Sequence, residues 1–290
     1  MSTLLAFLFA GHLMVAAQPA ENVSWEQLKE RADSAFAEEE YGVAQGQYRK
    51  AIQAAKGASL SEQADLHNQL GRTLYEMDQL AEARKVYQRG LDLHSRAGTA
   101  ETADAGAIWY NLGHVHGDMD QVKEAEFAYQ RCAEIERAAL GADSLELAVT
   151  LAQLGNYLAN QKDYSKADQY LAEAAGIRKK QGDAQAGETL KDWAINRYRL
   201  SDYERAIALA RDAIELSGED EAVRGLSFNV IAMSHEARDE FGPAAANYRH
   251  ALRLLRDALG FQDEQFKSVA SNYVDLAIEH DPAWAVEAPE

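Results

Sequence analysis

The stretch Trp109-Tyr-Asn-Leu-Gly-His-Val-His116 decides the fold of this 290-residue chain. In this stretch the positions i, i+3, i+4 and i+7 are occupied by Trp109, Leu112, Gly113 and His116. Residues at this spacing share one face of an α-helix. After a turn at 118–120, a second set follows at helical spacing: Val122, Ala125, Tyr129 and Cys132. The pattern therefore predicts two antiparallel helices joined by a short turn.

This helical pair is repeated along the chain. Gly113 has counterparts at Gly71 and Gly155, each directly after a large apolar residue. A glycine inside a helix costs about 1 kcal/mol relative to alanine, so its recurrence at one register predicts close helix contact there. Six other glycines precede the units at intervals of 41, 43, 41, 36 and 42 residues: Gly57, Gly98, Gly141, Gly182, Gly218 and Gly260. A period of this size predicts a solenoid.

The repeated unit resembles a known family. A large-x-x-large-Gly sequence, followed by alanine, aromatic and small residues in a second helix, is similar to the tetratricopeptide repeat, and the resemblance covers residues 25–279. The long period and the joint at Ala139-Leu-Gly-Ala-Asp143 are similar to repeats of the kinesin-light-chain type, about 42 residues long. The resemblance implies an all-α, right-handed superhelical solenoid with about six units and a C-terminal capping helix.

Helix starts and irregular units can be placed from the same register. Capping-box patterns beginning at Ser24, Ser59 and Asp143 predict a helix after each. The first, fifth and sixth units depart from the packing pattern, at Arg31, Ala35, Arg197, Ala232 and His235. Because the short 36-residue interval brackets the fifth unit, we expect a weak joint or a change of curvature there.

Composition excludes some classes of partner. The net charge of -18 repels phosphate backbones and anionic lipid headgroups, so nucleic acid is not expected to bind. The single cysteine, Cys132, cannot form an internal disulfide and occupies a small-residue packing position, where we expect an inert buried thiol.

The N-terminal segment has the pattern of a signal peptide. Leu4 to Ala17 is apolar and ends in the small-x-small sequence Val15-Ala-Ala17, which predicts cleavage between Ala17 and Gln18 and export to the periplasm or the exterior. An uncleaved membrane anchor and a helix capping the first repeat are the alternatives. The expected organisation is a signal peptide at 1–17, a repeat solenoid at 18–279 without a membrane span, and a disordered tail at 280–290.

No motif in the chain points to catalysis, and no cofactor is expected. His114 and His116 precede Asp118 and Asp120, but residues two apart on a helix point in nearly opposite directions. A shared metal site is therefore not expected. Phosphate-binding loops and nucleophile motifs are missing from the sequence, so we expect no catalytic residues and a chain that is not an enzyme.

A groove is the expected binding site. In tetratricopeptide folds the first helix of each unit lines the concave face, and the resemblance selects these residues: Asn68, Arg72, Tyr110, Asn111, His114, Gln153, Asn156, Asn160, Lys191, Tyr198, Arg199 and Asn229. Many are amides, which both donate and accept hydrogen bonds and so suit the backbone of an extended peptide. The alternative interpretation is that these are simply the polar residues found on any solvent-exposed concave surface.

The expected partner is a protein or peptide segment. Some tetratricopeptide domains hold chaperone C-termini with a lysine-rich clamp, but the matching positions here lack the lysines, so that partner class is rejected. Arg72, Lys191 and Arg199 are the expected positive points of the groove, which leaves a carboxylate-bearing partner open. Two other functions stay open: a self-assembling structural component, stacking through Tyr273, Leu276 and Ile278 of the last helix into a homo-oligomer, and a regulatory subunit that senses a peptide.

Overall fold

The computed structural model describes residues 23–281, which form thirteen α-helices and one short 3-10 helix. Six antiparallel pairs follow one another: α1 (Trp25–Ala37) and α2 (Tyr41–Ala54), α3 (Leu60–Glu76) and α4 (Leu80–Ala97), α5 (Ala103–Asp118) and α6 (Val122–Ala139), α7 (Leu145–Asn160) and α8 (Tyr164–Gln181), α9 (Ala186–Arg199) and α10 (Tyr203–Leu216), α11 (Glu221–Glu236) and α12 (Phe241–Leu259). The last helix, α13 (Glu264–His280), packs on α12. The predicted all-α solenoid of six units and a capping helix is confirmed.

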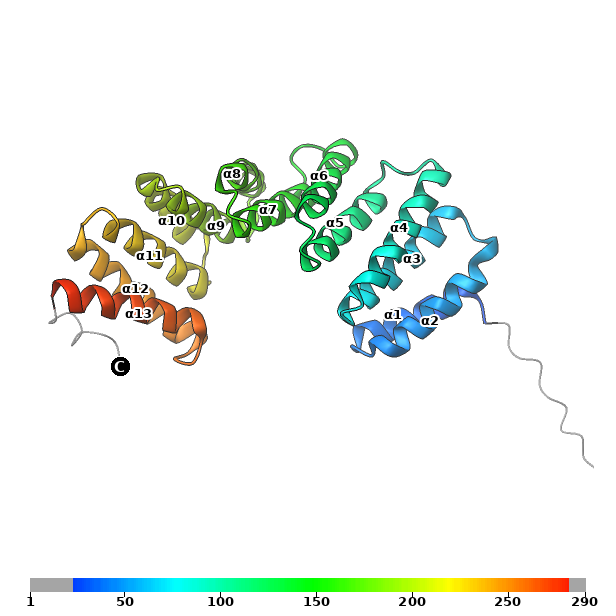
Figure 1. The fold of residues 1–290 in the computed structure, drawn as a ribbon, viewed down its shortest axis with the longest axis horizontal. Helices are drawn as coiled ribbons and strands as arrows, with labels where there is room; N and C mark the ends of the chain where they lie inside the picture. The colour runs from blue at the N-terminus through cyan, green and yellow to red at the C-terminus, as the bar shows by residue number, and fades with distance from the viewer. Residues whose placement is uncertain (1–22, 282–290) are drawn as a thin grey trace, which may run out of the picture.

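The pairs are arranged along an arc (Figure 1). Each helix packs mainly against its partner in the pair and against the next helix in the chain, as expected for a solenoid. The first helices α5, α7 and α9 lie on the inner side of the arc, and α6, α8 and α10 lie on the outer side (Figure 1). The inner side is therefore a continuous concave face.

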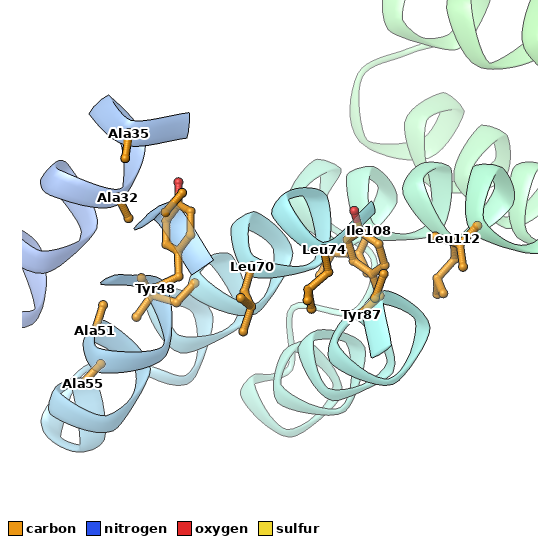
Figure 2. Packing of buried hydrophobic residues seen from close by; sticks show 14 of the residues in the cluster. Ala32, Ala35, Tyr48, Ala51, Ala55, Leu70, Leu74, Tyr87, Ile108 and Leu112 are labelled. Carbon is orange, nitrogen blue, oxygen red and sulfur yellow. The ribbon is translucent and has the colours of Figure 1, made fainter. Parts of the chain in front are cut away.

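The recurring glycines let each inner helix approach an aromatic or aliphatic side chain of its partner. A β-carbon on Gly71 or Gly113 would lie 2.5 Å from Cε1 of Tyr87 or Tyr129, and one on Gly155 would lie 2.7 Å from Cγ of Leu171. These partners each lie seven residues after the first residue of their helix and are fully buried. Figure 2 shows how Tyr48 and Tyr87 continue this packing through the first units. Close contact thus offsets the helix cost of the glycines.

Two kinds of turn separate the helices. Between the helices of a pair, one non-glycine residue adopts positive φ in every unit: Glu39, Asp78, Asp120, Lys162, Ser201 and Asp239. Between units, Gly98 and Gly182 end α4 and α8 in the left-handed conformation that favours glycine. Gly57 differs from the other five joint glycines, because it lies in the 3-10 helix η1 (Ala55–Gly57) and has no positive φ.

The predicted helix starts are confirmed, with one change of capping residue. Ser24 and Ser59 form complete capping boxes with Gln27 and Glu62. At the start of α7, however, the hydroxyl of Ser144 accepts the backbone hydrogen bond, while the Asp143 carboxylate pairs with Lys180.

The fifth unit is shorter because it lacks a helical turn. Helix α10 has 14 residues where α4, α6 and α8 have 18, which accounts for the short glycine interval. In the same unit Arg197 replaces an apolar packing residue, and its guanidinium pairs with Asp168 at 2.6 Å and Asp202 at 3.1 Å. Helix α9 also packs directly on α11, more extensively than other consecutive inner helices pack on each other. The packing between units therefore changes at this joint.

Two expectations fall on residues beyond those described. The signal peptide, with its cleavage site between Ala17 and Gln18, lies outside residues 23–281, as does the tail from residue 282 onward, so both stay predictions. The expected start of the tail at residue 280 is corrected, because α13 continues to His280, whose ring stacks on Phe241 at a centroid distance of 3.5 Å. None of the helices between residues 23 and 281 has the length and apolar character to cross a bilayer.

Candidate functional site

Three hollows follow one another along the concave face. The first, of about 350 Å³, lies over α3, α5 and α7 and is lined by Asn68, Tyr110 and Val149 among others. The second, of about 400 Å³, shares Val149 with the first and extends over α9 to the start of α11. The third, of about 370 Å³, shares Asn156 and Asp192 with the second. Because neighbouring hollows share residues, they form one row from the second unit to the start of the sixth, and we call this row the groove.

The predicted amides meet across the joints between units. The Nδ2 of Asn111 on α5 donates a hydrogen bond to Oδ1 of Asn68 on α3 at 3.0 Å. The Nδ2 of Asn156 on α7 donates to Oδ2 of Asp192 on α9 at 2.8 Å. Each bond fixes the orientation of the side chains, while the amides retain further donors and acceptors that can face a ligand.

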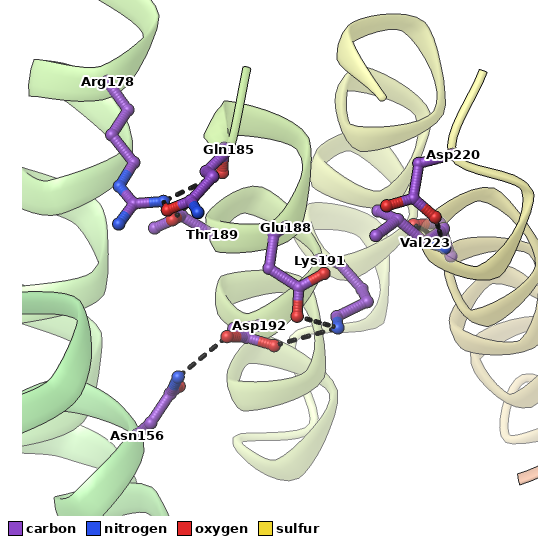
Figure 3. Close-up of polar contacts among 10 residues, drawn as sticks. Asn156, Arg178, Gln185, Glu188, Thr189, Lys191, Asp192, Asp220 and Val223 are labelled. Carbon is purple, nitrogen blue, oxygen red and sulfur yellow. Dashed lines mark hydrogen bonds and ion pairs between the residues drawn. The ribbon is translucent and has the colours of Figure 1, made fainter. Parts of the chain in front are cut away.

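Lys191 is not a free positive charge in the groove. Its side chain is only 8% exposed, and its Nζ lies 2.7 Å from Glu188 and 3.4 Å from Asp192 (Figure 3). Burial by itself would lower the pKa of Lys191, but Asp192 and Glu188 raise it by more. The pKa is therefore raised overall, and the ammonium stays charged and paired. Burial also raises the pKa of Asp192. The expectation that Lys191 attracts a carboxylate of the partner is therefore corrected, because its ammonium is already paired with Glu188 and Asp192 of the same helix.

The other two expected positive points are exposed but already have neighbours. The guanidinium of Arg72 lies 5.0 Å from the centre of the Phe36 ring and donates to Oε1 of Gln69 at 3.0 Å. Arg199 donates to the hydroxyl of Tyr164 at 3.5 Å. Both line the groove, Arg72 in the first hollow and Arg199 in the third.

His114 and His116 have separate surroundings, as the helical spacing predicts. His114 packs edge-on against Tyr110 at 4.8 Å and Tyr129 at 5.5 Å, and burial lowers its pKa. His116 instead pairs through Nδ1 with Oε1 of Gln121 at 2.6 Å. Across residues 23–281 no three His, Cys, Asp or Glu side chains are grouped as a metal site requires.

The remaining predicted residues divide between the groove and the C-terminal units. Gln153 lines the second hollow and Asn160 the third. Tyr198 lines a separate hollow of about 330 Å³ with Met233 of α11 and Asn272 of α13. Asn229 of α11 lies 3.9 Å from the sulfur of Met233 and lines none of the hollows described above. The groove therefore gathers the predicted residues from Asn68 to Arg199, apart from His114, Lys191 and Tyr198.

One lining residue, Glu136, was missed because it lies on the outer helix α6. The residue is 9% exposed, and its Oε2 has no hydrogen-bond partner. Burial raises its pKa, and burial also raises the pKa of the neighbouring Cys132 thiol to about 12, as expected for an inert cysteine. The repeat register gave no clear signal, because the equivalent positions are apolar in the first and last units, Ala55 and Leu255, but polar in the second and fourth, His94 and Arg178.

Comparisons with known proteins agree with this architecture. A tetratricopeptide repeat family model matches residues 104–180, and a second matches residues 64–97. Among solved structures, the chain is similar to BtubC (BKLC) from P. vanneervenii, with 15% identity and a TM-score of 0.63 over 82% of this chain and 94% of that one. No curated protein matches the chain in sequence.

Two further structures are similar in fold. Kinesin light chain TPR-like repeats from Podosopora anserina share 14% identity, with a TM-score of 0.57 over 67% of this chain and 95% of that one. A Rap protein in complex with competence and sporulation factor shares 14% identity, with a TM-score of 0.54 over 88% of this chain and 75% of that one. At these identities the similarity establishes the fold.

Proposed function

Because the chain is a tetratricopeptide repeat protein, we propose that it is a non-enzymatic scaffold that holds an extended protein or peptide segment in the groove. The supporting observation is the pair of amide contacts, Asn68 with Asn111 and Asn156 with Asp192, which span unit joints within adjoining hollows. A row of oriented amides offers donors and acceptors to a peptide backbone without requiring one side-chain sequence. Because these side chains are already held in place, little entropy is lost when a segment binds.

The similar Rap structure gives this proposal independent support. That protein was solved with competence and sporulation factor bound, so an arrangement of helices like this one can accommodate a ligand. A regulatory role, in which a bound peptide controls an enzyme elsewhere, would use the same groove.

The double variant Asn111→Ala/Asn156→Ala is expected to lose the proteins that the wild-type chain recovers from a native extract. Both substitutions remove groove amides that link neighbouring helices. Phe127→Ser is the matched control, because Phe127 is exposed on α6, the outer helix of the same unit as Asn111. Quantitative mass spectrometry of the recovered proteins is the measurement, with circular dichroism to confirm folding. Identical recovery by the double variant and the wild type would remove the groove from the function.

A second candidate function, self-assembly, has one observation in its favour. Tyr273 and Leu276 of α13 are buried in the core, but Ile278 is 66% exposed and Val274, one turn earlier, is 41% exposed. This apolar pair lies on the last helix of the solenoid, where an end-to-end contact would form. If it forms, the mass measured by light scattering rises with concentration, and Ile278→Ser abolishes the rise. A concentration-independent monomer mass would exclude this function.

A further inference from the structure

We propose that the first hollow of the groove binds a lysine side chain of the partner segment, with Glu136 as the residue that pairs with its ammonium. This inference rests on the proposed function, because the lysine arrives as part of a segment in the groove. It assigns a position and a chemical class to one side chain of that segment.

The Glu136 carboxyl group has hydrogen bonds with the Thr150 hydroxyl and the Cys132 thiol, which use only part of its capacity to accept. It is more than nine-tenths buried, and its Oε2 accepts no hydrogen bond. The side chain packs beside Gly106 of α5, where even an added β-carbon would be in ordinary contact with Cγ of Glu136, at 3.9 Å. A buried polar atom left unpaired is destabilising, and more so when it is charged. A ligand that supplies a donor would recover this energy.

In two other units the equivalent residue pairs with the joint that follows its helix, although Nε of Arg178 has an ion pair with Asp183 and no hydrogen bond. His94 in α4 pairs through Nδ1 with the Thr99 hydroxyl at 2.9 Å. Arg178 in α8 donates to Oε1 of Gln185 at 2.7 Å. Each partner lies within seven residues of its residue, in the joint that directly follows the same helix. Glu136 and Arg178 both line hollows of the groove, but the joint after α6 provides no hydrogen bond to Oε2 of Glu136.

The walls of the hollow favour a long aliphatic stem that ends in a compact cation. Ala107, Tyr110 and Val149 provide apolar surface, and the volume of about 350 Å³ accommodates a side chain of lysine size. Lysine buries its methylene groups along apolar surface and ends in a point charge, whereas the planar fork of arginine needs two acceptors side by side. The terminal torsion of a glutamate is soft, so either oxygen can turn toward the ammonium.

The charges around the hollow also favour a cation. Glu146 lines the rim and is exposed, which adds a second carboxylate. Arg72 is the cation of this hollow, but its guanidinium lies over the Phe36 ring and binds Gln69. The chain as a whole carries a net charge of -18, so a basic segment is drawn toward it over a distance.

Selection of random peptides on the chain tests this assignment. Peptides are selected in parallel on the wild type, on Glu136→Gln and on Glu146→Gln; the two variants each remove one negative charge and therefore have equal net charge. We expect the wild type and Glu146→Gln to enrich lysine at one fixed position, and Glu136→Gln to lose this preference. The enriched lysine peptide should bind Glu136→Gln about tenfold or more weakly than the wild type. Its norleucine analogue should bind both equally.

Two results would overturn the inference while leaving the groove in place: lysine enrichment that persists on Glu136→Gln, or groove-dependent peptides without a fixed lysine. Groove dependence is measured by weaker binding to Asn111→Ala/Asn156→Ala. If no enriched peptide depends on these two amides, the proposed function fails and the inference fails with it. The melting temperature of Glu136→Gln should equal or exceed that of the wild type, because the substitution removes a buried charge; a fall would show that Glu136 is a structural residue.

Discussion

Replacing Tyr129 with alanine is expected to destabilise the fold by about 3–5 kcal/mol, the range found for removing a large aromatic side chain from a core. Tyr129 is 1% exposed and lies between the two helices of the third unit. Its ring centre is 5.8 Å from that of Tyr110, 5.5 Å from His114 and 6.0 Å from Tyr157. Truncation therefore removes the contact that joins α5, α6 and α7, and the midpoint of guanidinium unfolding should fall strongly.

Tyr129→Leu is the matched control for this cavity. The fourth unit carries Leu171 at the same register, packed on Gly155 as Tyr129 packs on Gly113. Leucine is thus a residue that the repeat accommodates at this position, and the loss should be clearly smaller than for alanine. Equal midpoints for the wild type and Tyr129→Ala would show that the ring does not stabilise the joint.

Gly113→Leu is expected to destabilise the fold by about 1–3 kcal/mol through overpacking. The new β-carbon would lie 2.5 Å from Cε1 and 2.6 Å from Cδ1 of Tyr129, closer than carbon atoms can approach. The ring is buried among Tyr110, His114 and Tyr157, so relieving the clash requires these neighbours to shift or α5 and α6 to separate. The melting temperature measures this effect.

The same substitution at Gly176 should have the opposite sign. Gly176 lies in the interior of α8, is exposed, and has no atom within 4 Å of its added β-carbon. Relieving a helix-interior glycine there should stabilise the chain by up to about 1 kcal/mol. If Gly113→Leu and Gly176→Leu changed stability alike, the close helix contact would not explain the recurring glycines.

The fold could be predicted from sequence because one packing contact is copied. Each recurring glycine contacts the residue seven positions after the start of the partner helix, as seen at Gly71, Gly113 and Gly155. Recognising this contact in one unit therefore predicts the helix pairing in the others. The caps at Ser24 and Ser59 are local patterns and were equally predictable. The exchange of Asp143 for Ser144 at the start of α7 was not, because Lys180, 37 residues later, pairs with Asp143.

The candidate site could be predicted only in part. Tyr110, Asn111 and Asn156 were found from their place on inner helices, and they do line the groove. The pairing of Lys191 is different, since Glu188 lies three residues before it and this helical spacing was itself a sign of an internal ion pair. Glu136 was hidden because acidic residues are common in this chain and are usually solvated. Its burial beside the first hollow arises from the packing of neighbouring helices, which the sequence pattern does not show.

The claim that the inner face holds the partner is tested most directly by side-chain resonances of the full chain with and without the captured partner segment. We predict that the Asn111 and Asn156 side-chain amide resonances shift on binding, together with the methyl resonances of Val149, which is shared by two hollows. The ring of Phe127 on α6 and the methyl groups of Ile278 on α13 should be unaffected. Shifts confined to Phe127 or Ile278, with the groove amides unchanged, would contradict binding in the groove.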